Sequence, residues 1–89
     1  MLIYFSTSFD NDTAKSTVSE FQELDMENCY LCPVLVFSAL EEFSEQEKIT
    51  LRLDLLTVCD EIIFDGELND EMRKELEFAK LVGMEVSFL

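Results

Sequence analysis

The sequence contains few or none of several residue types on which common sites depend. It has no histidine, one proline and two glycines, and only 6 of its 89 residues are lysine or arginine. The motif CYLC (29–32) leaves a single further cysteine, so the cysteine and histidine ligands of a structural zinc site are missing. The 20 acidic residues give a formal net charge of −14, which opposes direct binding to nucleic acid. We therefore expect no metal, no cofactor and no nucleic-acid ligand.

Long apolar runs are also missing, since no stretch approaches the roughly 20 apolar residues that cross a bilayer. The first residues, MLIYFSTS, lack the basic flank of a secretory signal. Three cysteines form no even disulfide set, as is usual in a reducing compartment. A strand at 29–32 would direct Cys29 and Cys32 to opposite faces, which favours packing roles over redox chemistry. The sequence predicts a cytoplasmic protein without a membrane segment.

The remaining composition predicts one domain over residues 1–89. Hydrophobic residues make up 48% of the chain, enough for a packed core, and no linker or repeat interrupts it. Short apolar runs predict strands, and capping residues before amphipathic stretches predict helices. The predicted strands are 2–6, 28–32, 61–64 and 85–89; the predicted helices follow Asp10, Ser44 and Asn69, and a short helix within 34–43 is left open.

Helices between successive strands give the order βαβαβαβ. Such connections predict an α/β fold with a small, parallel, four-stranded Rossmann-like (flavodoxin-like) sheet and helices on both faces. Ligands of these sheets bind beyond the carboxyl ends of the strands. We expect that edge to comprise residues 6–12, 34–38 and 65–71.

Glu75 is the residue that most invites a chemical interpretation. It follows Met72 by three residues and precedes Ala79 by four, so it borders the buried stripe of its helix. Its helix starts at the edge of the sheet where ligands bind, and Glu75 lies in the second turn of that helix. A carboxylate in this place could act as a nucleophile on a sugar. Alternatively, Glu75 is an ordinary residue on the helix flank, paired with Lys74 or Lys80.

Residues 55–89, LLTVCDEIIFDGELNDEMRKELEFAKLVGMEVSFL, resemble the C-terminal half of nucleoside 2-deoxyribosyltransferase-like domains, including small phage and bacterial members of unknown function. The positions that carry the resemblance are Asn69, Glu71, Glu75 and Ala79. IYFSTSF (3–9) is similar to the family's first strand and loop, with Tyr4 at its aromatic position, and Cys32-Pro33 is similar to the end of its second strand.

This resemblance implies a catalytic glutamate that forms a covalent glycosyl intermediate, and Glu75 stands at its position. It also implies ligand-binding roles for Tyr4, Ser6, Asp65, Asn69 and Glu71. Two of these residues depart from the family pattern. Asn69 replaces the assisting acid, and an amide cannot supply a carboxylate's charge or proton. Glu71 replaces a glycine and would extend into the space of the sugar, so we expect an impaired enzyme.

Two functions with a binding partner or ligand follow from these observations, and a structural or regulatory domain without a ligand is left open as a third. The first is a catalytically impaired, acidic domain that acts by protein–protein interaction, as a phage-type inhibitor that binds the basic surface of a nucleic-acid-binding host protein in the host cytoplasm. The alternative is nucleoside binding, or residual deoxyribosyltransferase or N-glycosidase activity with Glu75 as nucleophile. It predicts a neutral nucleoside ligand and a homodimer, since active family members are oligomers whose sites borrow residues from a neighbour.

Overall fold

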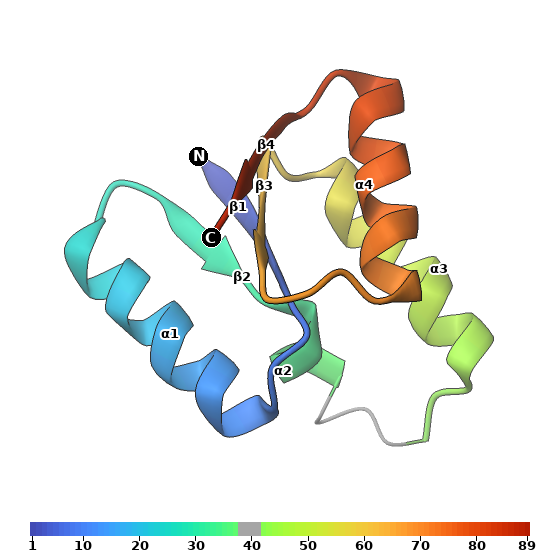
Figure 1. Cartoon of the computed structure of the whole chain (residues 1–89), viewed down its shortest axis with the longest axis horizontal. Coiled ribbons are helices and arrows are strands. Elements are labelled where there is room, and N and C mark those ends of the chain that lie inside the picture. The colour runs from blue at the N-terminus through green and yellow to red at the C-terminus, as the bar shows by residue number, and fades with distance from the viewer. Residues whose placement is uncertain (38–41) are drawn as a thin grey trace.

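A parallel sheet organises the computed structural model of this chain, which describes residues 1–37 and 42–89 (Figure 1). In this part of the chain the sheet has four strands in the order β2-β1-β3-β4. The strands are β1 (Leu2–Thr7), β2 (Cys29–Leu31), β3 (Glu61–Asp65) and β4 (Glu85–Phe88). All three pairings are parallel, and the central strand β1 places Tyr4 opposite Leu31 on one side and Ile62 on the other. The predicted fold class is confirmed.

Helices cover both faces of this sheet, as predicted. Figure 1 shows α1 (Asn11–Leu24) on one side, and α3 (Glu45–Thr57) and α4 (Asp70–Val82) together on the other. A further short helix, α2 (Pro33–Phe37), follows β2. Pro33 therefore begins a helix, a position where its fixed φ and missing N–H cost little. The rest of the ambiguous segment 34–43 includes residues 38–41, which lie outside the described residues.

The predicted capping residues define where the longer helices begin. Asp10 Oδ1 accepts a hydrogen bond from Thr13 N at 2.8 Å, and Asn69 Oδ1 accepts one from Met72 N at 2.9 Å. Ser44 and Glu47 form the expected reciprocal capping box. These side chains satisfy N–H groups that have no partner within their helix. The carboxyl ends of β1 and β3 are thereby each followed by a helix N-terminus at the same edge of the sheet.

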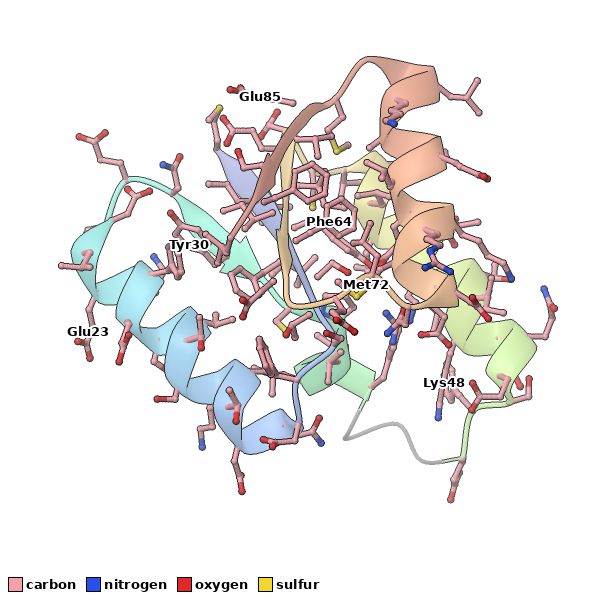
Figure 2. All side chains as sticks on the ribbon, viewed as in Figure 1. Glu23, Tyr30, Lys48, Phe64, Met72 and Glu85 are labelled. Atoms are coloured by element: carbon pink, nitrogen blue, oxygen red, sulfur yellow. The ribbon has the colours of Figure 1, made fainter. Side chains whose placement is uncertain are left out.

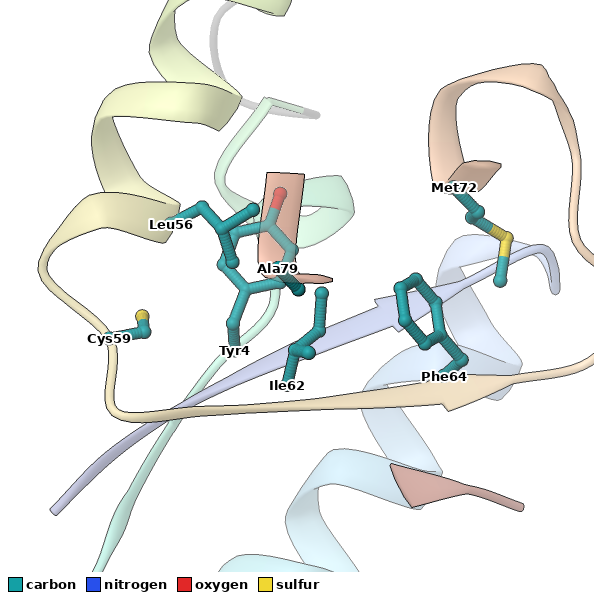
Figure 3. Packing of buried hydrophobic residues seen from close by; sticks show 7 residues of the cluster. All are labelled: Tyr4, Leu56, Cys59, Ile62, Phe64, Met72 and Ala79. Carbon is teal, nitrogen blue, oxygen red and sulfur yellow. The ribbon is translucent and has the colours of Figure 1, made fainter. Parts of the chain in front are cut away.

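Two apolar layers pack against the sheet because neighbouring strand residues point to opposite faces. Figure 3 shows the larger layer, on the side of α3 and α4, formed by Tyr4, Leu56, Cys59, Ile62, Phe64, Met72 and Ala79. On the opposite face, Phe5 packs with Ala14 and Cys32 beneath α1. Both layers meet at β1, which is buried on both sides and holds its side chains in fixed positions.

The three cysteines are free thiols. Cys29 is exposed and Cys32 is buried, as expected for residues on opposite sides of a strand. Burial raises the pKa of the Cys59 thiol to about 11, so this thiol stays protonated at neutral pH. Within residues 1–37 and 42–89, no helix combines the length and the apolar character needed to cross a membrane.

Gly66 generates a stability prediction, because its backbone has φ +89° and its Cα faces the β1–α1 loop. A Cβ at this position would overlap Ser8 Oγ and lie 3.2 Å from the ring of Phe9. We expect Gly66→Ala to lower the free energy of unfolding by about 2–4 kcal/mol in urea denaturation.

Gly83→Ala is the matched control. Gly83 has φ +73°, but a Cβ at this position would meet no atom within 4 Å, so only the backbone cost of about 1–2 kcal/mol applies. Equal losses in the two variants would show that the exposed side chains of Ser8 and Phe9 move aside at no measurable cost.

Candidate functional site

The candidate site is centred on a hydrogen bond between β1 and α4. Ser6 Oγ donates to Glu75 Oε1 at 2.7 Å, and both residues are only 2% exposed. Ser6 lies near the carboxyl end of β1, and Glu75 lies in the second turn of α4. The alternative of an ordinary helix-flank residue paired with Lys74 or Lys80 is wrong, because Glu75 is buried and makes no ion pair with any described residue.

Tyr4 adds a second polar atom to this buried cluster. Its hydroxyl and Glu75 Oε2 are both buried, and neither has a hydrogen-bond partner among the described residues. The pKa of Tyr4 is raised, first by burial and then by the negative charge of Glu75 nearby. The three sequence-predicted residues Tyr4, Ser6 and Glu75 are therefore brought together: Ser6 bonds one carboxylate oxygen, and the Tyr4 hydroxyl lies near the carboxyl group without forming a hydrogen bond to it.

Arg52 on α3 is the functional residue that the sequence analysis missed. Its Nη2 lies 3.3 Å from Glu71 Oε2, and its guanidinium carbon lies 5.0 Å from the centre of the Phe37 ring. The Arg52 side chain is 15% exposed, so this ion pair is more shielded from water than a surface pair. Arg52 follows Ile49 by three residues and precedes Leu53, so it lies beside the apolar stripe of α3. This spacing was the signal in the sequence that could have indicated a partly buried arginine.

The space beside Glu75 is too small for a sugar. A cavity of about 40 Å³ is lined by Ile49, Arg52, Leu53, Glu71, Lys74 and Glu75. This volume can hold a water molecule, which needs about 10–15 Å³, whereas small-molecule sites measure roughly 300–1,000 Å³. Glu71 lines this cavity, and its ion pair with Arg52 holds its side chain there.

Burial sets the protonation of Glu75. Removal from water raises the pKa of this carboxyl group, and the negative charge of Glu71 raises it further. The nearby Tyr4 hydroxyl, the hydrogen bond from Ser6 and the positive charge of Arg52 lower the pKa, but burial is the larger effect. A raised pKa disfavours the ionised carboxylate, which is the nucleophilic form, so this environment works against the chemistry that the resemblance implies for Glu75.

The other two predicted ligand-binding residues lie outside the Glu75 cluster. Asn69 is exposed, and its side-chain oxygen is used to cap α4. Asp65 is half-buried at the end of β3, in register with Thr7 at the end of β1. Neither residue lines the cavity beside Glu75.

Acidic side chains surround the carboxyl edge of the sheet. We define the acidic rim as Asp10, Asp12, Asp65, Glu67, Asp70 and Glu71. The loops that carry these residues are joined by a hydrogen bond from Ser8 N to Asp65 O at 3.2 Å. Asp70 and Glu71 form ion pairs with Arg73 and Arg52, and the other four have no ion pair with a described residue. Glu75 is buried below the rim and is not part of it.

The same rim makes the N-terminus of α4 unsuitable for phosphate. Asp70 and Glu71 lie in the first turn of this helix, where their charges offset its dipole. Among the described residues, no group of three histidine, cysteine, aspartate or glutamate side chains is arranged to hold a metal ion.

Comparisons with known proteins gave no match: no protein-family model, no curated protein and no solved structure is similar to this chain. The resemblance to the deoxyribosyltransferase-like domains consequently rests on the residues named above.

Glu75 generates a prediction about pH and stability. The pKa of Glu75 is raised in the folded state, so the protonated side chain favours folding. This contribution to the free energy of unfolding is complete below the ordinary glutamate pKa of about 4.3. It is lost as the pH rises through the folded-state pKa. Glu75→Gln cannot ionise, so we expect it to be more stable than the wild type at pH 7 and similar to it at pH 4.

Thermal unfolding at a series of pH values measures this difference. Glu77→Gln is the control, because it removes one negative charge from an exposed position on the same helix. A stabilisation at pH 7 that is equal in both variants would assign the effect to net charge rather than to the burial of Glu75.

Proposed function

We propose that this chain is a catalytically impaired, acidic interaction domain with a deoxyribosyltransferase-like fold, which binds the basic surface of a nucleic-acid-binding protein. The observation that carries this proposal is the acidic rim. Four of its carboxylates, those of Asp10, Asp12, Asp65 and Glu67, have no cationic partner among the described residues. They are therefore available to cations of another protein.

The rim supports this function because it offers several negative charges at one edge of the sheet to lysine and arginine side chains, as a phosphate backbone does. Its position on two connected loops, with α1 and α4 capped at their N-termini, limits the entropy lost on binding. A protein with a net charge of −14 also attracts a basic partner over distances near the Debye length. This proposal fits a cytoplasmic inhibitor, including one encoded by a phage.

The surroundings of Glu75 support the loss of catalysis. The ion pair between Arg52 and Glu71 borders a cavity of about 40 Å³, and the raised pKa of Glu75 favours its protonated form. In this proposal, Glu75 stabilises the contact between β1 and α4, and the acidic rim binds the partner.

The rim generates a prediction on binding. Asp12→Lys combined with Glu67→Lys should weaken capture of a basic partner from a lysate by about tenfold or more, because it replaces attraction with repulsion at the rim. The captured protein should be released by salt and by duplex DNA, since DNA would compete for the same cations.

Glu20→Lys combined with Glu77→Lys is the matched control, with the same net charge and reversals on the exposed surfaces of α1 and α4. Equal loss of capture in the two double variants would show that only the total charge matters. Capture that resists DNA would remove the nucleic-acid-binding partner from the proposal.

Nucleoside binding is the second candidate, and the unpaired polar atoms of Tyr4 and Glu75 favour it. In a wider pocket, these two atoms could bond to a sugar hydroxyl or a base. A dimer could supply the rest of such a site. The Glu71 side chain is the direct obstacle, because it lines the same small cavity as Glu75.

Removing this obstacle generates a further prediction. By calorimetry with millimolar nucleoside, we expect no binding to the wild type, weak binding to Glu71→Ala, and none to Glu71→Ala combined with Glu75→Gln. Binding to the wild type as strong as to Glu71→Ala would contradict the role given to Glu71. The absence of binding in all three proteins would exclude the second candidate.

A further inference from the structure

Strand β4 has an unpaired edge. Among residues 1–37 and 42–89, only β3 pairs with it. Leu89 N donates to Phe64 O at 2.9 Å, which directs this N–H towards β3. Because successive N–H groups of a strand alternate in direction, those of Val86 and Phe88 point away from β3. The sheet therefore ends in backbone donors and acceptors that another strand can pair with.

One face of β4 is acidic. Glu85 and Ser87 are exposed, and Figure 2 shows Glu85 projecting from β4 on the side away from α4. Glu85 is the register partner of Glu61 on β3, so two carboxylates lie side by side on this face. The pKa of Glu61 is raised, first by burial and then by the charge of Glu85. A cation placed here would relieve the repulsion between the two carboxylates.

The other face of β4 is apolar. Val86 packs against the core layer beneath α4, and the Phe88 ring stacks on Phe64 with ring centres 5.5 Å apart. Phe64 is 1% exposed, but Phe88 is 60% exposed. An apolar side chain added beside Phe88 would cover this surface and gain hydrophobic free energy.

We propose that the edge of β4 binds an extended segment of a basic partner, in which lysine or arginine residues alternate with apolar residues, as an additional strand of the sheet. Residues opposite Glu85 and Ser87 would place their cations on the acidic face, and residues opposite Val86 and Phe88 would place apolar groups on the other. This inference rests on the proposed function for the basic character of the partner, and it adds the surface and the sequence pattern that are recognised.

Charge favours this segment over a second copy of the chain. Self-pairing through β4 would bring together two chains of net charge −14, and the segment EVSF (85–88) contains no cation for Glu85 or Glu61. The cations of a basic segment would instead lie beside Glu85 and Glu61. This difference between attraction and repulsion makes the edge specific for a basic segment over a second copy of the chain.

Two short peptides of identical composition test the proposal. In the first, lysine alternates with valine; in the second, the lysines and valines form separate blocks. Both carry the same charge, but only the alternating peptide can place all its lysines on one face of a strand. By fluorescence anisotropy at low salt, we expect the alternating peptide to bind about tenfold more tightly, with chemical-shift changes at residues 84–89.

Two pairs of variants locate the binding. Glu85→Lys should weaken binding of the alternating peptide by about tenfold, and Glu77→Lys, with the same charge change on α4, by much less. Phe88→Pro should weaken binding more than Phe88→Ala, because both lose the ring but only proline removes the outward N–H. Unfolding curves of each variant establish that the fold is retained.

Equal binding of the two peptides, or equal effects of Glu85→Lys and Glu77→Lys, would overturn this inference. So would a concentration-dependent dimer that is lost in Phe88→Pro, because a second copy would then occupy the edge. The proposed function is tested separately. If capture of the basic partner depends on the acidic rim but not on Glu85, the proposed function stands and only this inference fails. If the peptide binds at the β4 edge but no partner is captured through the rim, the proposed function is contradicted.

Discussion

The hydrogen bond between Ser6 and Glu75 is the contact around which the site is arranged. It joins the central strand β1 to α4 across the larger apolar layer, at 2.7 Å and out of contact with water. A carboxyl group in this place needs partners or a proton, because an isolated buried charge is costly. Ser6 supplies one bond, and the Tyr4 hydroxyl and the positive charge of Arg52 lie nearby, but the effect of burial is larger and raises the pKa of Glu75. Packing and protonation of this residue are therefore inseparable.

The ion pair between Arg52 and Glu71 joins a buried acid to the surface in this fold. Both residues line the cavity of about 40 Å³ beside the buried Glu75, and Glu71 itself belongs to the acidic rim, with its side chain 41% exposed. Arg52 also packs on Phe37, so the position of the guanidinium is held from two directions. The same parallel topology thus produces an enclosed carboxyl group and an exposed ring of carboxylates. Only the latter can meet another macromolecule, which is why the surface is the better candidate for function.

Most of the architecture could be predicted because its signals are local. Asp10, Ser44 and Asn69 cap helices at the positions expected from their spacing, and the alternation of apolar strands with helices indicated the parallel sheet. The site was less accessible. Glu75 was expected at the border of a buried stripe, and its burial depends on Ser6, which is 69 residues away in sequence. Contacts between different elements, such as the ion pair between Arg52 and Glu71, can hardly be predicted from the spacing of residues along a helix.

The unpaired edge of β4 follows from the order of the strands, which the alternation of strands and helices does not determine. The sequence alone identified 85–89 as the last strand, but not that it lies at the end of the sheet beside β3. A carbon-13 NMR titration of the glutamate carboxyl groups is the most direct test of the central claim, that Glu75 is enclosed in the core. We predict that the Glu75 resonance titrates above the ordinary glutamate value of about 4.3 and above those of the exposed glutamates on the same helix. A Glu75 resonance that titrates together with those of the exposed glutamates would contradict it.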